Sequence, residues 1–216
     1  MSSQPKRDPI SDHLLTPENS ALVLIDYQAP QVNTIRSMDS IKLVANVVAL
    51  AKVAQLFKLP IVLSSVGVQS GVNPDTIPQL KEALPNVVGI DRTSINAWED
   101  ADFVAAVKAT GRKKLIMAAL WTEVCLAFPA LDAIHDGFEV YAVADAVAGT
   151  STIAHETALQ RVYQAGGHPV TWLSVLCELQ RDWNRQGTAS GMLQIGSEHG
   201  GPWSTEIAIK QFAAHA

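Results

Sequence analysis

The sequence has few of the residues on which several classes of protein depend. Its 216 residues include only two cysteines, with no CxxC motif and no Cys/His pairs at zinc-binding spacing. A disulfide framework is therefore excluded, and a zinc site of that type is not indicated. No apolar stretch reaches the roughly 18 residues needed to span a bilayer. We therefore expect no membrane partner.

An excess of positive charge is also absent. The formal net charge is −5, and the lysines and arginines are scattered along the chain. A nucleic-acid partner would require a basic patch, so none is expected. The first twenty residues are polar and contain no apolar signal core, and no glycine-rich phosphate loop occurs. These absences predict a protein of the reducing cytoplasm that acts on a small molecule.

Hydrophobic residues are plentiful at 48%, enough for one substantial core. From residue 21 onward, short apolar runs alternate with patterns of helical period. The expected strands are 21–25, 61–64, 86–90, 114–120, 138–144 and 168–173, and the expected helices are 40–58, 98–110, 123–136, 152–165 and 174–185. This order predicts the α/β class, a single domain of three α/β/α layers around a six-stranded, mainly parallel, doubly wound sheet.

Three segments follow from composition. Residues 1–19 are expected to form an N-terminal extension, and residues 20–185 the domain. Residues 186–216 are rich in Gly, Ser and Ala, with an amphipathic stretch near Ile207 to Phe212. We interpret them as an arm that packs on another subunit, with a disordered tail as the alternative. Residues predicted to be helical core are Ile41, Val44, Val48, Ala51 and Cys177.

Cys125 is the first candidate for chemistry. It follows the strand 114–120, with Thr122 as the expected helix cap and the helix beginning at Glu123. Unpaired N–H groups and the positive end of the helix dipole stabilise a thiolate and can also bind an oxyanion. If Thr122 caps the helix, however, its hydroxyl would occupy the N–H of Cys125. A small hydrophobic core residue is the alternative interpretation of Cys125.

Two more candidates follow strands. In doubly wound sheets the ligand crevice lies beyond the carboxyl ends of the strands, where strand order reverses. Asp26 comes after the first strand and is a candidate general base for the thiol. Arg92 comes after the third strand, and its permanent charge can bind an anionic group but cannot move a proton. The alternative for Asp26 is a turn aspartate bonded to the local backbone. The alternative for Arg92 is a surface arginine paired with Asp91 or Glu99.

A rival triad consists of Cys125, Asp145 and His168, in the chain order of the α/β-hydrolases. Two observations argue against this triad. The glycines of a nucleophile elbow are absent around Cys125, and His168 precedes its strand instead of following it. Glu123 is interpreted as an acid that complements the helix dipole.

The chain resembles the isochorismatase-like cysteine hydrolases in three features. These are the aspartate after the first strand, the basic residue before the helix 98–110 and the motif Thr-Glu-Val-Cys. This superfamily includes nicotinamidases and N-carbamoylsarcosine amidohydrolases. The resemblance covers about residues 20–185. The stretches 95–98, 121–125, 128–131 and 177–183 are similar to a bacterial subgroup of octameric hydrolases whose substrate is unsettled, which implies a homo-oligomer, with an octamer as one form.

The resemblance implies Asp26 as general base, Arg92 in the place usually held by lysine, and Cys125 as nucleophile. It also implies a cis peptide bond between Leu120 and Trp121, which would aim the Trp121 N–H at the oxyanion. The candidates for oxyanion or substrate contacts are Trp121, Thr122, Gln28, Asn96 and Trp98.

Two departures from the family matter. Arginine in place of lysine cannot donate a proton, and residues 64–69 lack the metal ligands of nicotinamidases, so no metal and no other cofactor is expected. The leading hypothesis is a cysteine hydrolase that cleaves a C–N bond of a small amide or related acyl compound through a thioester. The alternatives are an oligomeric small-molecule-binding protein with residual hydrolase machinery and a redox-active thiol protein.

Overall fold

The computed structural model describes residues 7–214, and its centre is one six-stranded sheet. The strand order is β3-β2-β1-β4-β5-β6, and all neighbouring strands run parallel. The predicted α/β class and doubly wound sheet are confirmed. The strands are β1 (Ser20–Ile25), β2 (Ile61–Val66), β3 (Ile90–Arg92), β4 (Lys114–Ala119), β5 (Glu139–Val143) and β6 (His168–Val170).

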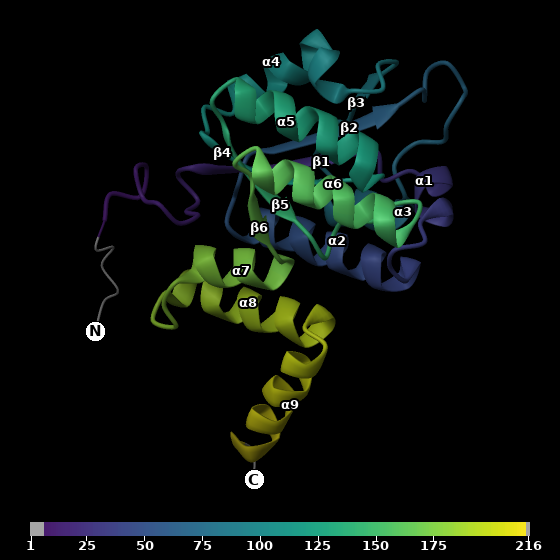
Figure 1. The fold of residues 1–216 in the computed structure, drawn as a ribbon. Helices are drawn as coiled ribbons and strands as arrows, with labels where there is room; N and C mark the ends of the chain where they lie inside the picture. Colours follow the sequence, from purple (N-terminus) through teal and green to yellow (C-terminus); the bar gives the residue numbers. More distant parts are fainter. Residues whose placement is uncertain (1–6, 215–216) are drawn as a thin grey trace.

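Helices cover both faces of the sheet (Figure 1). Helices α4, α5 and α6 lie on one face, and α2 and α7 lie on the other. A sheet covered in this way needs apolar side chains on both sides of its strands, and all six residues of β1 and of β4 are buried. The helices are α1 (Ala29–Thr34), α2 (Ser40–Leu56), α3 (Pro78–Ala83), α4 (Ala101–Ala109), α5 (Ala127–His135), α6 (Thr152–Gln164), α7 (Trp172–Gln180), α8 (Gln186–His199) and α9 (Pro202–Ala214).

Several predicted boundaries were wrong. The third strand was expected at 86–90, but β3 begins at Ile90, so Arg92 is its last residue. The sixth strand was expected to continue to residue 173. It ends at Val170 because the Thr171 side chain accepts from the Ser174 N–H and so caps α7. The short helices α1 and α3 were not predicted, since six residues are too few to show a helical period.

Two groups predicted as core are exposed or half-exposed. In α2, Ile41 is 80% exposed and Val44 and Val48 are half-buried, while Ala51 alone of the predicted stripe is buried. The helix instead buries a neighbouring stripe that includes Leu43, Val47 and Leu50. Cys177 is also exposed, because α7 turns Val175, Leu176 and Leu179 to the core.

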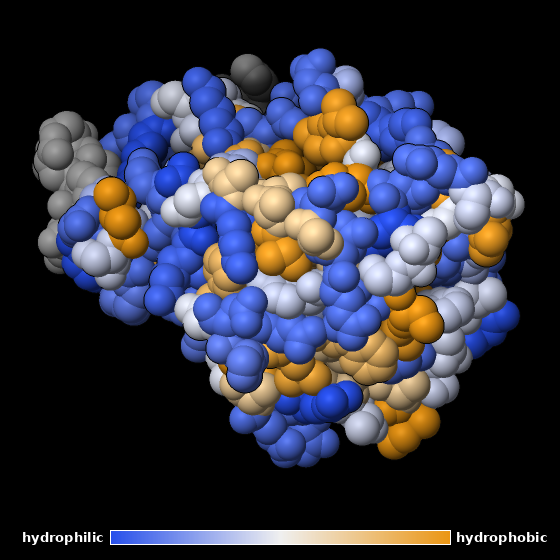
Figure 2. Space-filling model, turned by 90° about the horizontal axis from the view of Figure 1, so that it is seen from above, coloured by the Kyte–Doolittle hydropathy of each residue, from blue (hydrophilic) through white to orange (hydrophobic). Residues whose placement is uncertain are grey.

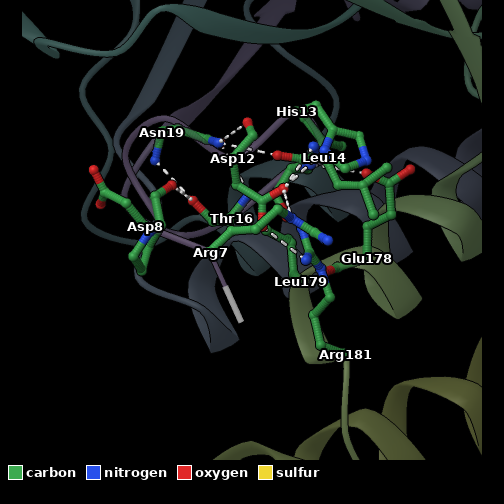
Figure 3. Close-up of polar contacts among 12 residues, drawn as sticks. Arg7, Asp8, Asp12, His13, Leu14, Thr16, Asn19, Glu178, Leu179 and Arg181 are labelled. Atoms are coloured by element: carbon green, nitrogen blue, oxygen red, sulfur yellow. Dashed lines mark hydrogen bonds and ion pairs between the residues drawn. The ribbon is translucent and has the colours of Figure 1, made fainter. Parts of the chain in front are cut away.

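The segment before β1 is held against the end of α7 by a charged network (Figure 3). The Asp12 carboxylate accepts from Arg7 Nε and from Arg181 Nη1, each at 2.9 Å. Glu178 of α7 accepts from the Leu15 N–H at 2.8 Å. Burial would raise the pKa of Asp12, but the bonds from the Leu14 N–H, Arg7 and Arg181 outweigh it and lower that pKa well below its usual range.

Residues 186–214 form two helices rather than a disordered tail. Helix α8 packs on α2 of the same chain, with Gly191 so close that a Cβ there would lie 2.5 Å from Leu56 Cδ1. Helix α9 extends away from the rest of the molecule (Figure 1). None of the helices in residues 7–214 has the length and hydropathy needed to cross a membrane.

Candidate active site

The sheet has its switch point between β1 and β4. The chain runs outward from β1 to β2 and β3, then returns to place β4 on the other side of β1. A crevice is expected beyond the carboxyl ends of these two strands. Asp26 follows β1 directly, and residues 121–125 follow β4. The topology therefore brings together two of the three predicted catalytic residues.

Arg92 joins them by reaching across β2. Its Nη1 and Nη2 donate to Asp26 Oδ1 and Oδ2, each at 2.7 Å, and both side chains are fully buried. On the way, Nη1 also donates to Ser64 Oγ at 3.1 Å and to the Ser65 carbonyl at 3.2 Å. Burial would lower the pKa of Arg92, but Asp26 raises it above its ordinary value. The guanidinium is therefore a permanent charge beside Asp26.

The pair differs from the alternatives, because Arg92 is buried and both carboxylate oxygens of Asp26 bind it. Arg92 is not a surface arginine paired with Asp91, because the Asp91 carboxylate accepts from the N–H groups of Val68 and Gln69. Asp26 has a φ of 61°, in the left-handed region that aspartate tolerates better than most residues. Its N–H donates to the Ser64 carbonyl at 2.9 Å.

Cys125 lies within hydrogen-bond reach of Asp26 and is 8% exposed. Burial raises the pKa of this thiol, and the charge of Asp26 and its hydrogen bond raise it further. Arg92 and the backbone N–H of Trp121 act in the opposite direction without cancelling the rise. These effects favour a protonated thiol, from which Asp26 would have to take the proton. Desolvation here outweighs the stabilisation of a thiolate that a helix terminus alone would provide.

The turn that carries Cys125 is a π-helix over Thr122–Leu126, followed by α5. The Leu126 N–H donates to the Trp121 carbonyl at 3.2 Å, five residues back. Single π-turns of this kind are frequent at functional sites. The peptide bond between Leu120 and Trp121 is cis, as the resemblance implies.

Thr122 is not the cap that the sequence predicts, because Trp121 occupies the N-cap position. The Thr122 N–H donates to the Ala148 carbonyl at 3.0 Å, and its Oγ1 lies 2.8 Å from Nδ1 of His155 in α6. The hydroxyl is therefore engaged with His155 and not with the N–H of Cys125. The conflict over that N–H, expected from the sequence, does not arise.

Glu123 holds the loop that precedes α6. Its Oε1 accepts from the Thr150 N–H at 3.0 Å and from Thr150 Oγ1 at 2.7 Å. A Cβ at Gly149 would lie 2.5 Å from Glu123 Oε2 and 3.0 Å from the His155 backbone N, so a larger residue there would displace the Glu123 side chain. Neither Gly149 nor His155 was singled out from the sequence. No local pattern connects these residues to Thr122 and Glu123, because the contacts form between separate elements.

Three further candidates have their polar groups bound to the protein itself. Gln28 Nε2 donates to the Val66 and Pro74 carbonyls at 3.2 and 2.6 Å, and its Oε1 accepts from the Val66 N–H. Asn96 donates to Asp132 Oδ2 at 2.7 Å and caps the turn at Trp98.

The Trp98 indole donates to Asp136 Oδ2 at 3.0 Å and packs edge-on against Phe103 and Phe138. These bonds give Gln28, Asn96 and Trp98 roles in positioning loops. Their contact with substrate stays a prediction. The Trp121 indole lies over α1 and donates to the Gln31 carbonyl at 3.2 Å.

The rival triad is not assembled. His168 packs its ring against Tyr141, with centroids 4.8 Å apart, and the two residues are paired across β5 and β6. Asp145 accepts from the Trp172 N–H at 2.9 Å. Over residues 7–214, no three or more His, Cys, Asp or Glu side chains gather in a way that could hold a metal ion.

A family model, the isochorismatase domain, matches residues 20–174. The chain belongs to the isochorismatase family of hydrolases. The chain is 41% identical to the probable hydrolase YcaC of Escherichia coli over 186 residues, which are 86% of this chain and 88% of that protein.

Two solved structures of family members are similar over nearly the whole chain. YcaC of Escherichia coli, an octameric hydrolase of unknown specificity, superposes with a TM-score of 0.87 at 37% identity, covering 98% of this chain and 100% of that one. YcaC from Pseudomonas aeruginosa, with hexane-2,5-diol and covalent acrylamide, superposes with a TM-score of 0.86 at 37% identity. That match covers 93% of this chain and 98% of the other.

Proposed function

We propose that this protein is a cysteine hydrolase that cleaves a C–N bond of a small amide or related acyl compound through a thioester. The observation that carries the proposal is the buried contact between Asp26 and Cys125, with Arg92 bound to both Asp26 oxygens. A thiol and a carboxylate in hydrogen-bond contact are a nucleophile and its base.

The first half of the reaction forms the thioester. Asp26 takes the proton from Cys125 Sγ, and the sulfur attacks the substrate carbonyl. The N–H groups of Trp121 and Cys125 hold the oxyanion, and the Trp121 N–H already acts on the resting sulfur, where it lowers the pKa of the thiol. The C–N bond then breaks as Asp26 returns the proton to the leaving amine.

Water completes the second half. Asp26 takes a proton from water, the hydroxide attacks the thioester carbonyl, and the C–S bond breaks. The proton returns to the sulfur, and the carboxylic acid leaves. Throughout, Arg92 holds the orientation of Asp26 and balances its charge without transferring a proton.

Two relatives support a nucleophilic side chain and an assembly. Acrylamide, which is covalently bound in the Pseudomonas aeruginosa relative, is a small amide that carries a group reactive toward nucleophiles. The Escherichia coli relative is octameric, and we infer that this protein is also a homo-oligomer. We also infer a cytoplasmic location, since a nucleophilic thiol is best preserved in a reducing compartment.

The redox alternative is disfavoured by the site. Sensor cysteines are accessible and have a low pKa, whereas burial and Asp26 raise the pKa of Cys125. Cys177 is exposed, but burial of part of its side chain raises its pKa as well.

Mass spectrometry of the intact protein tests the proposal. After brief mixing with a panel of small amides and activated acyl esters, at least one compound should leave an acyl group on Cys125 that water then removes. Cys125→Ala should abolish the adduct, and Cys177→Ala should leave it unchanged. An adduct confined to Cys177, or turnover retained by Cys125→Ala, would remove Cys125 from the nucleophile role.

A further inference from the structure

Helix α2 presents an apolar groove to the surface. Ile41, Val44 and Val48 lie on its side that faces α3, and Ile41 is 80% exposed. The groove has a volume of about 450 Å³. We call it the α2–α3 groove, and its lining residues are Ile41, Val44, Ala45, Val48, Lys52, Gln79, Glu82, Ala83 and His199.

Charged groups border this apolar floor. Lys52 Nζ lies 2.6 Å from Glu198 Oε2 and 3.0 Å from His199 Nε2, so the end of α8 closes one end of the groove. Glu82 of α3 is exposed and lies on the rim. An apolar centre with a polar border is the usual composition of a protein interface. Elsewhere, on the face seen from above, apolar patches are interspersed with polar residues (Figure 2), which is normal for any protein surface.

Helix α9 carries an apolar face without a partner among the described residues. Ile207 is buried, and the Trp203 ring packs over Gly196 of α8. On another side, Ile209 is 64% exposed and Phe212 is 79% exposed. Residues three apart on a helix lie next to each other, so these two form one contact surface. Lys210, beside them, is paired with Glu206 one turn earlier in the same helix.

We propose that the Ile209–Phe212 face of α9 docks into the α2–α3 groove of a second copy of this chain. A helix laid in an apolar groove through residues at i and i+3 is a common recognition mode. Helix α9 extends away from the body of its own chain (Figure 1), which leaves its tip accessible to a second copy. The inference rests on the proposed homo-oligomer and identifies the surfaces that form it.

The contact is head-to-tail, because the helix and the groove are different surfaces. Each copy gives one helix and receives one, so successive contacts close into a ring or continue as a filament. A closed ring is the form we expect, since a ring buries every groove and every α9.

Directed cross-linking tests the contact. In the Cys177→Ala background, Ile41→Cys and Phe212→Cys are made singly, coexpressed as two chains, and oxidised. The expected result is a covalent dimer that joins one chain of each kind, with at least tenfold less dimer from either variant alone. The Cys177→Ala parent controls for Cys125. Dimers formed by Ile41→Cys alone would indicate that two grooves face each other. Dimers formed by Phe212→Cys alone would indicate that two α9 helices pair, and the absence of any dimer would indicate that no such contact forms. Each of these three results overturns the proposal.

Native mass spectrometry separates this inference from the proposed assembly. Phe212→Ser is expected to raise the dissociation constant of the oligomer by about tenfold or more, the usual loss for a central aromatic residue. Ile153→Ser is the matched control, because Ile153 is 72% exposed on α6 and lies outside the groove. A monomeric parent protein would overturn the assembly itself. An oligomeric parent without the Ile41 to Phe212 cross-link would overturn the docking alone, and neither result bears on thioester formation.

Discussion

Arg92 and Asp26 face each other through two parallel N–H···O bonds of 2.7 Å, although they stand 66 positions apart in the chain. The guanidinium also bonds Ser64 Oγ and two backbone carbonyls, so it is fixed in place. Each carboxylate oxygen has a second lone pair, which leaves Asp26 able to accept from the thiol of Cys125. The pair is therefore compatible with a general base that is oriented by its counter-ion.

The first prediction concerns Asp26→Asn. The amide cannot accept a proton, so thioester formation should fall about 10²- to 10⁴-fold. At the same time the variant loses the carboxylate charge that raises the pKa of Cys125, so that pKa should fall. Iodoacetamide labelling against pH should therefore shift to lower pH while single-turnover acylation slows. A variant that acylates at the parent rate would contradict the base assignment.

The second prediction separates charge from geometry at Arg92. Lysine keeps the charge but cannot make the two-pronged contact with Asp26, so Arg92→Lys should retain part of the acylation rate. Arg92→Met should lose about 10²-fold or more. It also leaves a buried carboxylate unpaired, a change that costs about 3 to 5 kcal/mol of unfolding free energy. Thermal denaturation must accompany the kinetics, and equal losses in folded Lys and Met variants would point to geometry alone.

The third prediction tests the support of the π-turn by His155. Thr122→Val keeps the size of the side chain but removes the oxygen that contacts Nδ1. Displacement of the turn should slow acylation by about tenfold to 10²-fold. Thr152→Val, at an exposed position in α6, is the control. Unchanged acylation in Thr122→Val would show that the contact does not position Cys125.

The fourth prediction follows from burial, which lowers the pKa of His155, although Glu123 and Glu156 act against it. The unfolded chain then binds the proton more readily, so stability rises with pH in this window. Above a pH of about 6.5, the ordinary histidine pKa, burial of His155 costs no stability through protonation. The loss of stability grows as the pH falls from there toward the pKa of His155 in the folded protein. His155→Gln should reduce the change in melting temperature between pH 7 and pH 5. A variant whose melting temperature depends on pH as strongly as that of the parent would contradict the prediction.

The fifth prediction concerns Asp12. Its lowered pKa contributes stability above the ordinary aspartate value of roughly 3.9, and this is lost as the pH falls toward the folded pKa. Asp12→Asn should cost about 1.5 to 3 kcal/mol at neutral pH, the range for hydrogen bonds to a charged group. Hydrogen exchange should increase in residues 7–19. Asp8→Asn, at an exposed carboxylate, is the control, and equal effects of the two would contradict the role of the Asp12 network.

The sequence by itself determined the fold class and the family. Apolar runs such as 21–25 and 114–120 are periodic and local, and they predict a parallel sheet without knowledge of the partners of each strand. The motif Thr-Glu-Val-Cys and the aspartate after the first strand indicated the family in the same way. Exposure within a helix was less predictable: Ile41 fits a core pattern, but α2 turns the neighbouring stripe of Leu43 and Val47 to the sheet.

Only the tertiary structure decided how the site is held together. The strand order places β2 between β1 and β3, so Arg92 must cross it to reach Asp26. Burial and the Asp26 charge, neither of which is visible in the local sequence, raise the pKa of the Cys125 thiol. The partner of Thr122 proved to be His155 in α6, 33 residues later. Hydrogen bonds between distant residues depend on strand order and helix packing, whereas helical and strand periods depend on neighbours along the chain.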